Sequence, residues 1–286
     1  MGEHPLDEAT ASDMRRLVRT VLAEDLGSGD RTATLIPDNT RASASIVTRE
    51  AMVLAGRPWV DALFAELDSS VQVRWHCADG DTLASGDTLC QLSGPARALL
   101  SGERSALNIL QTLSATATTA AAYAEAVRGT GCRILDTRKT LPGLRLAQKY
   151  AVRCGGATNH RVGLFDAVLI KENHILAAGS IGRAIENARR NNPDVLIEIE
   201  VEDLAELDLA LQGAPDRILL DNFSHDDLKT AVARNRDHEH AVELEASGNV
   251  SLVDVRRTAE TGVDFISVGA LTKHVTAIDL SMRVDT

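Results

Sequence analysis

The apolar residues near the N-terminus follow a helical repeat. Leucine and valine occupy positions 17, 18, 21 and 22, and this spacing places them on one face of a helix. Ser12 can accept a backbone hydrogen bond at a helix start, and Gly27 supplies a stop signal. The pattern therefore predicts an amphipathic helix between Ser12 and Gly27.

The following segment changes to shorter periods. Residues 41–56 alternate apolar and polar side chains, as strands do. Two Gly-Asp-Thr-Leu units at 80–83 and 86–89 indicate short strands joined by Gly-Asp turns. A helical pattern then runs from Pro95 to Val127, with leucines 99, 100, 107 and 110 on one face. Residues 1 to about 112 are therefore expected to form a mixed α+β domain.

A different rhythm begins at Cys132, where short apolar runs alternate with helical patterns. Such alternation favours parallel strands joined by right-handed helical crossovers. We expect an α/β barrel, incomplete in its closure, over residues 113–274, although an open doubly wound sheet fits the same pattern. Leu164–Ile170 is interpreted as a buried strand. The expected strands are 133–136, 166–170, 195–201, 217–220, 241–246 and 264–269.

Polar or small residues stand at the end of each expected strand. In α/β barrels the active site forms at the carboxyl ends of the strands. Along the chain, the first strand ends carry cations, the middle ones carry carboxylates and the last ones carry small hydrogen-bonding residues. Two further candidates, His160 and Arg161, lie before the second strand. This order suggests a ligand with two anionic regions and a polyol or a metal between them. The strand-end residues are Thr137, Arg138, Lys139, Lys171, Glu200, Asp221, Ser247, Gly248, Asn249 and Gly269.

Several of these positions also have an ordinary structural interpretation. Arg138 and Lys139 could form a solvated turn, and Lys171 could pair with its neighbour Glu172. Asp221 could cap a helix, and the Ser247–Asn249 segment could do the same instead of binding a phosphate.

The strand at 195–201 poses a sharper problem. Alternation places Glu198, Glu200 and Glu202 on one face of the chain. Three like charges on one face of a central strand are costly unless cations or a metal meet them. A structural ion-pair network and a functional site both satisfy that requirement.

The charge distribution excludes some classes of partner. The chain has a formal net charge of −11, which argues against general binding to nucleic acids or anionic membranes. The stretch from Arg133 to Lys171 is nevertheless strongly basic, with 8 Lys or Arg against 2 Asp. A local basic region on an acidic protein suits a small anionic ligand.

The cysteines and the N-terminus indicate a cytoplasmic protein. The 4 cysteines form no CxxC pair and no zinc-like spacing, so we expect free thiols. The first residues are polar and acidic, unlike a signal peptide, and no apolar run has the length of a membrane span.

The longest motif, residues 136–174, reads "DTRKTLPGLRLAQKYAVRCGGATNHRVGLFDAVLIKENH". It closely resembles the quinolinate phosphoribosyltransferase family. Shorter matching segments cover most of the remaining chain. They are 24–32 ("EDLGSGDRT"), 102–118, 197–202, 219–224, 244–250 and 262–274.

The resemblance implies a fold, an assembly and a reaction. It implies an N-terminal α/β sandwich domain, which residues 275–286 could join, and a C-terminal, incomplete α/β barrel. It also implies a homodimer with shared active sites. The implied reaction joins quinolinate to 5-phosphoribosyl 1-diphosphate and yields nicotinate mononucleotide, diphosphate and CO₂. This is a step of NAD synthesis, and Mg²⁺ is the implied cofactor.

The resemblance also implies roles for individual residues of the matched motifs. Lys139, Glu200 and Asp221 are the implied catalytic residues. Glu200 and Asp221 would hold the ribose hydroxyls and help to place Mg²⁺, and Lys139 would contact phosphoribosyl diphosphate. Thr137 is a further implied substrate-binding residue. The 5′-phosphate would lie against Ser247, Gly248, Asn249 and Gly269. The two carboxylates of quinolinate would be bound by Arg138, His160, Arg161 and Lys171, with Arg104 supplied by the other subunit.

Two other activities fit parts of the pattern. A nicotinate-type phosphoribosyltransferase would use the same fold without decarboxylation, but the several cations around 138–171 favour two carboxylates over one. A Schiff-base aldolase would use a strand-end lysine such as Lys171, provided that its neighbours keep it neutral.

Overall fold

The structure is a computed structural model that describes residues 5–285, and the chain divides into two compact units. Unit 1 contains the described residues through 121 together with 140–156 and those from 271 onward. Unit 2 contains residues 122–139 and 157–270. In the described part of the chain, no helix has both the length and the apolar character needed to cross a membrane.

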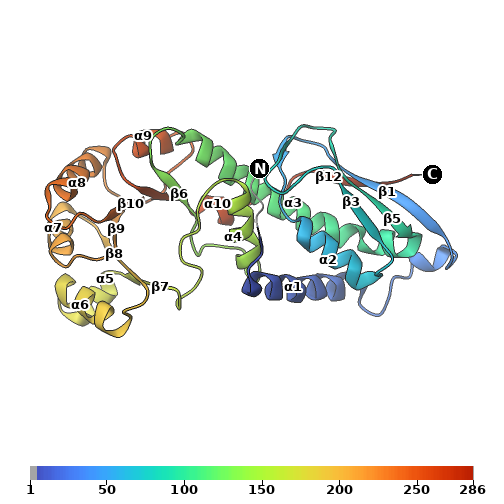
Figure 1. Ribbon diagram of the computed structural model, residues 1–286, viewed down its shortest axis with the longest axis horizontal. Helices are drawn as coiled ribbons and strands as arrows, with labels where there is room; N and C mark the ends of the chain where they lie inside the picture. Colours follow the sequence, from blue (N-terminus) through green and yellow to red (C-terminus); the bar gives the residue numbers. More distant parts are fainter. Residues whose placement is uncertain (1–4, 286) are drawn as a thin grey trace. The chain divides into compact units, whose positions relative to one another are not determined.

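Unit 1 combines a four-stranded antiparallel sheet with helices (Figure 1). The sheet has the order β12-β1-β5-β3, so that the C-terminal strand pairs with the first one. β2 and β4 form a separate short pair. The strands are β1 Arg41–Thr48, β2 Met52–Val53, β3 Gln72–Trp75, β4 Thr82–Leu83, β5 Thr88–Pro95 and β12 Leu280–Asp285. The helices are α1 Glu8–Leu26, α2 Arg57–Leu67, α3 Ala96–Ala126 and α4 Arg145–Cys154, with a short 3-10 helix at Ala33–Leu35.

Two predictions for unit 1 need correction. The first helix begins four residues before Ser12, because Asp7 is the cap and its side chain accepts the Thr10 N–H at 2.7 Å. The helix stops at Gly27 as predicted. On α3 the predicted apolar face holds for Leu99, whereas Leu100 is 38% exposed. Successive residues lie about 100° apart around a helix, so Leu100 falls at the edge of the face that Leu99, Leu107 and Leu110 bury.

The two Gly-Asp-Thr-Leu units form the same turn twice, as their repetition suggests. Asp81 accepts the Ala78 N–H, and Asp87 accepts the Ala84 N–H, each at 2.8 Å. Each turn leads directly into a strand, β4 or β5.

Unit 2 is built around six parallel strands in the order β6-β11-β10-β9-β8-β7. Neighbours in the sequence are neighbours in the sheet, except that β6 and β7 lie at its two ends. This is the order of a barrel that stays open between β6 and β7, as the prediction of an incomplete barrel requires. The strands are β6 Arg133–Leu135, β7 Ala167–Ile170, β8 Leu196–Val201, β9 Arg217–Asp221, β10 Glu243–Ser247 and β11 Phe265–Ser267.

Helices follow these strands and cover their outer side (Figure 1). Their apolar residues pack on the outward residues of the strands, such as Ile199 and Leu220, which are fully buried. The opposite residues of each strand face the interior of the barrel and include the charged ones. The helices are α5 Glu172–Ala178, α6 Ile181–Asn191, α7 Leu204–Gln212, α8 His225–Asp237 and α9 Val255–Ala259, and α10 Ala270–Lys273 leads back toward unit 1.

The second predicted strand of unit 2 is shorter than its apolar run. β7 begins at Ala167, and the preceding Leu164 and Phe165 are 75% and 79% exposed. Asp166 causes the difference, because its carboxylate accepts the N–H groups of Val162 and Gly163 and closes a turn there. Apolar character alone could not reveal that turn.

Candidate active site

Parallel pairing brings several predicted strand-end residues to one edge of unit 2. Asp221 on β9 pairs in register with Ser247 on β10. Glu200 on β8 pairs with Leu219, which lies two residues before Asp221. Residues paired across parallel strands share a face, and side chains alternate along each strand. Glu200, Asp221 and Ser247 therefore lie on one face at neighbouring carboxyl ends.

Lys171 follows β7 and joins this group through Glu200. It is the N-cap residue of α5, and its Nζ forms an ion pair with Glu200 rather than with the adjacent Glu172. The local Lys171–Glu172 pair is therefore not the one that forms. The amino group that a Schiff-base aldolase would use is therefore engaged in an ion pair with Glu200.

The turn that carries His160 and Arg161 is anchored by Asp136. Thr158 pairs with Leu135 alongside β6, on the open side of the barrel. The fully buried Asp136 carboxylate then accepts hydrogen bonds from Asn159 Nδ2 at 2.7 Å and from the His160 N–H at 2.8 Å. A buried carboxylate requires such donors. Asp136 was not predicted to have a role, although a carboxylate at the end of the apolar strand "RILD" indicates that it has hydrogen-bond donors nearby.

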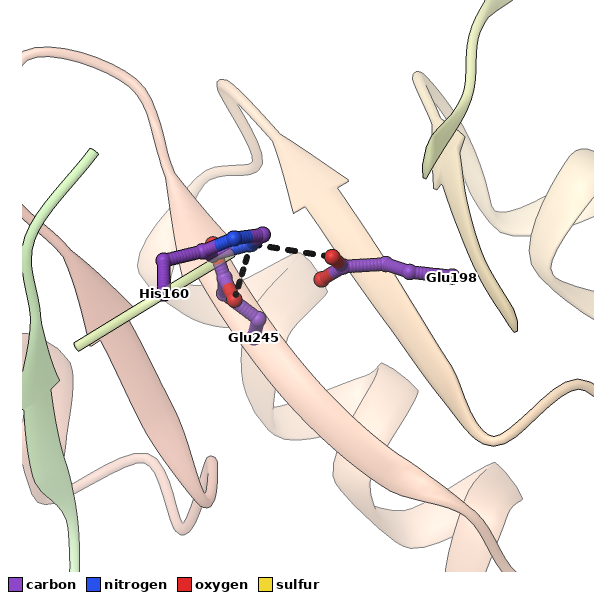
Figure 2. A group of neighbouring side chains, drawn as sticks. All are labelled: His160, Glu198 and Glu245. Carbon is purple, nitrogen blue, oxygen red and sulfur yellow. Dashed lines mark ion pairs between the residues drawn. The ribbon is translucent and has the colours of Figure 1, made fainter. Parts of the chain in front are cut away.

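The ring of His160 points into the barrel, where two carboxylates meet it (Figure 2). Nε2 lies 2.9 Å from an oxygen of Glu198 and 3.4 Å from an oxygen of Glu245, and both glutamate side chains are 0% exposed. Burial alone lowers the pKa of His160, but the hydrogen bonds and charges of the two carboxylates raise it to about 9. The ring is therefore an imidazolium at neutral pH.

One contact of the ring competes with that charge. The Arg161 N–H donates to His160 Nδ1 at 2.7 Å, an arrangement that suits a neutral ring. A hydrogen bond contributes about 1 kcal/mol net. A rise of the pKa from 6.5 to about 9 corresponds to about 3 kcal/mol. The two carboxylates therefore outweigh this single contact in setting the charge of the ring.

Arg217 on β9 completes the charges around this buried pair. Its Nη1 lies 3.5 Å from Glu245, its Nη2 lies 2.8 Å from Glu243, and its guanidinium lies 4.0 Å from the centroid of the Phe265 ring. Burial and the charge of Glu245 raise the pKa of Glu198. Burial is also the largest single influence on Glu245 and acts in the same direction, but the hydrogen bond and charge of His160, together with Ser267 and Arg217, outweigh it and lower the pKa of Glu245. Glu198 is therefore the nearer partner of His160. Glu245 is the partner whose ionised form the surroundings favour, because its pKa is lowered whereas that of Glu198 is raised.

Two guanidinium groups of the predicted quinolinate site influence each other. Burial lowers the pKa of Arg161, and the positive charge of Arg138 lowers it further. Arg161 is held by a hydrogen bond from Nη1 to the carbonyl oxygen of Ala167 at 3.2 Å. Because like charges repel, a bound dianion would relieve this unfavourable interaction.

The segment Ser247–Asn249 packs closely against Asn222. Gly248 and Asn249 have φ of 113° and 48°, and Asn222 has φ of 57°. A Cβ at Gly248 would lie 2.3 Å from Asn222 Oδ1 and 3.0 Å from its Cα, so only glycine fits. The segment Ser247–Asn249 does not cap the following helix, because α9 begins at Val255 and its N-cap residue is Asp254.

Asp221 is likewise not a helix cap. The following helix, α8, is capped by Ser224, whose side chain accepts the Asp227 N–H. Asp221 is the last residue of β9, and one of its oxygens accepts a hydrogen bond from Asn222 Nδ2 at 2.7 Å.

The ends of β6 and β11, which are neighbours in the sheet, bring three more predicted residues together. The Lys139 N–H donates to Thr137 Oγ1 at 3.1 Å. The Lys139 side chain passes over Gly269, where an added Cβ would lie 3.1 Å from Lys139 Cδ and 3.6 Å from Thr137 Oγ1. A side chain at position 269 would therefore crowd Lys139.

Glu200 and Asp221 offer the oxygen ligands that Mg²⁺ prefers. Two carboxylates on one face cannot enclose the ion alone, and Lys171 already neutralises part of the charge of Glu200. The residues therefore fit a Mg²⁺ ion that takes its remaining ligands from substrate phosphates and water.

Arg104 lies on α3 in unit 1 and is exposed. Its predicted contribution to the site of a second subunit stays a prediction.

Comparisons with known proteins agree over most of the chain. Residues 30–114 match the quinolinate phosphoribosyl transferase N-terminal domain, and residues 116–283 match the C-terminal domain. The chain is 42% identical to a nicotinate-nucleotide pyrophosphorylase [carboxylating] of Mycobacterium leprae, with 94% of this chain and 96% of that one covered. It is 41% identical to a probable enzyme of the same name from Synechocystis, with 92% and 90% covered.

Solved structures give the same result. The nicotinate-nucleotide pyrophosphorylase from Francisella tularensis superposes with a TM-score of 0.91 at 44% identity, with 96% of this chain and 97% of that one covered. Human nicotinic acid phosphoribosyltransferase shares the fold alone, with a TM-score of 0.61 at 13% identity and coverage of 95% and 74%. The chain belongs to the quinolinate phosphoribosyl transferase family.

Proposed function

We propose that this chain joins quinolinate to 5-phosphoribosyl 1-diphosphate, releasing diphosphate and CO₂ and giving nicotinate mononucleotide for NAD synthesis. Family membership supports the reaction class. The observation that carries the substrate choice is the pair Arg138 and Arg161: the Arg161 guanidinium is fixed on the Ala167 carbonyl oxygen at 3.2 Å, and Arg138 lies close enough for its charge to lower the pKa of Arg161. Such a pair suits a substrate with two carboxylates.

The quinolinate carboxylates would be bound by Arg138, Arg161 and Lys171. The planar guanidinium group can donate two parallel hydrogen bonds to one carboxylate. His160 belongs to the same turn, but its Nε2 already faces Glu198 and Glu245. Its contribution therefore includes holding the turn in place.

Phosphoribosyl diphosphate would bind across the other strand ends. Ser247, Gly248 and Asn249 would hold the 5′-phosphate, because glycine at 248 lets the backbone approach closely. Gly269 and Thr137 would leave room for Lys139 to reach the diphosphate. Glu200 and Asp221 would bind the ribose hydroxyls.

The chemistry requires charge balance rather than a covalent nucleophile. The pyridine nitrogen bonds to ribose C1 as the bond from C1 to the diphosphate oxygen breaks. Lys139 stabilises the departing diphosphate, and Glu200 and Asp221 stabilise positive charge at C1. Glu200 and Asp221 would hold Mg²⁺, which would supply further neutralisation of the diphosphate.

Decarboxylation then follows from the product of that step. The ring has become a pyridinium, so the bond between C2 and its carboxylate can break and leave its electron pair at C2. CO₂ departs, and C2 takes a proton from water. The arginines hold the dianion in place, and such orientation can lower the barrier by ~7–11 kcal/mol.

Product analysis tests this proposal. The protein is incubated with Mg²⁺, phosphoribosyl diphosphate and either quinolinate or nicotinate, and the mononucleotide is separated by chromatography. We expect nicotinate mononucleotide from quinolinate only. Formation from nicotinate but not from quinolinate would support the non-decarboxylating activity instead.

We further propose a homodimer in which Arg104 completes the partner's site, and a cytoplasmic location, which the 4 free cysteines support. A mixture of Arg104→Ala and Lys171→Ala proteins tests the shared site. Random reassociation would restore about a quarter of the active sites, because one site of each mixed dimer is intact. No recovery after verified subunit exchange would contradict the shared site.

A further inference from the structure

Two carboxylates lie inside unit 2 in a place that substrate binding does not explain. Glu198 on β8 and Glu245 on β10 are both 0% exposed, and they meet at the ring of His160. They lie one alternation step before the strand-end residues Glu200 and Ser247. They are therefore below the proposed substrate contacts and do not belong to them.

Burying two carboxylates is expensive unless cations stay with them. The structure supplies His160 at 2.9 Å and 3.4 Å, and Arg217 at 3.5 Å from Glu245. Removal of either carboxylate would leave these cations poorly matched. The cluster therefore holds the charged His160 ring by ion pairs.

The position of His160 determines that of the next residue. The His160 N–H is bound to Asp136 and its ring is bound to the two glutamates, so the residue is fixed at both ends. Arg161 follows directly, and its guanidinium is bound to Ala167 near β7. The turn thus spans the open side of the barrel between β6 and β7.

We propose that Glu198 and Glu245 are positioning residues for the quinolinate site: through the ring of His160 they hold the turn that presents Arg161 to the substrate. This inference rests on the proposed function. It adds two buried residues that touch no substrate but set the affinity for one of the two substrates.

The charged groups around His160 come from every strand that approaches it. Asp136 follows β6, Glu198 lies on β8, Arg217 lies on β9 and Glu245 lies on β10. Arg138 and Arg161 add positive charge on the substrate side. Glu198 and Glu245 are ion-paired to the ring, and Arg217 is ion-paired to Glu245, so the ring should titrate as part of the cluster.

The same three side chains could in principle hold a metal, since their ligand atoms lie within 4.8 Å of one another. Arg217 argues against this, because a guanidinium 3.5 Å from Glu245 competes with a second cation. Elemental analysis of the purified protein decides the point. One equivalent of tightly bound zinc that depends on His160 would overturn the proposal.

The kinetic test compares Glu198→Gln and Glu245→Gln with wild type. Each change keeps the shape of the side chain and removes its charge. We expect the KM for quinolinate to rise about tenfold, within the range seen for coupled contacting residues. The KM for phosphoribosyl diphosphate should change less than about twofold, because its proposed contacts lie on other turns. Glu243→Gln is the matched control, since Glu243 lies two residues from Glu245, pairs with Arg217 and does not touch His160 in the described contacts.

A double-mutant cycle shows whether the effect passes through His160. When Glu245→Gln is combined with His160→Gln, the two increases in quinolinate KM should not add, because both break the same contact. Fully additive effects would overturn the proposal. So would equal increases for both substrates, or an unchanged quinolinate KM in both glutamate variants.

A readout without turnover separates this inference from the proposed function. Nitrogen-15 NMR of the His160 ring in the substrate-free protein should give a pKa near 9, and Glu245→Gln should lower it. A wild-type ring that titrates near 6.5, the ordinary value, would overturn the proposal even if quinolinate is a good substrate. A raised pKa in a protein that does not use quinolinate would reject the proposed function alone.

Discussion

Replacing Gly248 by alanine should damage one half of the active site and leave the other half intact. At φ of 113° an alanine backbone is strained, which costs about 1–3 kcal/mol. The added Cβ would also lie 2.3 Å from Asn222 Oδ1 and 3.0 Å from Asn222 Cα. The side-chain oxygen can rotate away, but the Cα can move only with the end of β9. The cost therefore includes a shift of the residue that follows Asp221.

Kinetics and unfolding measure the two parts of that cost. We expect the urea midpoint of unit 2 to fall and the KM for phosphoribosyl diphosphate to rise roughly tenfold, as for a misplacement worth about 1.4 kcal/mol. The KM for quinolinate should change much less, because the Arg161 turn is anchored at Asp136 instead.

Gly182→Ala is the matched control for this substitution. Gly182 lies in α6, and a Cβ there would meet nothing within 4 Å. Alanine should therefore preserve both KM values and add up to about 1 kcal/mol of stability. If Gly248→Ala behaves like Gly182→Ala, the close approach at the end of β10 is not required and the reasoning is wrong.

Three further predictions concern charge. Arg138→Lys should raise the KM for quinolinate at least tenfold although the positive charge is retained, because lysine lacks the planar guanidinium group and charged hydrogen bonds contribute about 1.5–3 kcal/mol. Near-normal quinolinate affinity of this variant, measured by calorimetry, would contradict the assignment. The pKa of His160 rises on folding from 6.5 to about 9, so its contribution to stability is complete below pH 6.5 and is lost as pH rises through 9. The stability difference between wild type and His160→Gln should thus shrink by about 3 kcal/mol over that range, and a difference independent of pH in urea unfolding would refute it. Chelation of Mg²⁺ with EDTA should abolish mononucleotide formation until Mg²⁺ is restored, and full turnover in EDTA would exclude the metal.

The strands of unit 2 could be predicted closely because each is a short apolar run between polar ends. β8 was expected at 195–201 and is found at Leu196–Val201, and β9 was expected at 217–220 and is found at Arg217–Asp221. The interpretation of Leu164–Ile170 as one buried strand was wrong, because Asp166 closes a turn that composition does not show. The start of α1 was missed for a similar reason, because Asp7 and Ser12 are equally good caps by residue type.

The partners of the charged residues could not be predicted from their positions in the sequence. Glu198 and Glu200 share a face of β8, yet one meets His160 inside the barrel and the other meets Lys171 at its edge. That choice depends on strand stagger and on the pairing of Thr158 with Leu135, which involve contacts distant in the chain. Glu245 could have been predicted to face the same side as Glu198 does, because "ELEAS" repeats the alternation of "IEIEV". The inward direction of the His160 ring had no signal in the sequence.

The most direct test of the proposed reaction follows both of its products from one labelled substrate. Quinolinate labelled in its 2-carboxylate is mixed with excess protein, phosphoribosyl diphosphate and Mg²⁺, and labelled CO₂ and nicotinate mononucleotide are quantified together in a single turnover. The proposed reaction predicts one CO₂ for each mononucleotide and no product when phosphoribosyl diphosphate is left out. Mononucleotide without labelled CO₂, or CO₂ without mononucleotide, would contradict it.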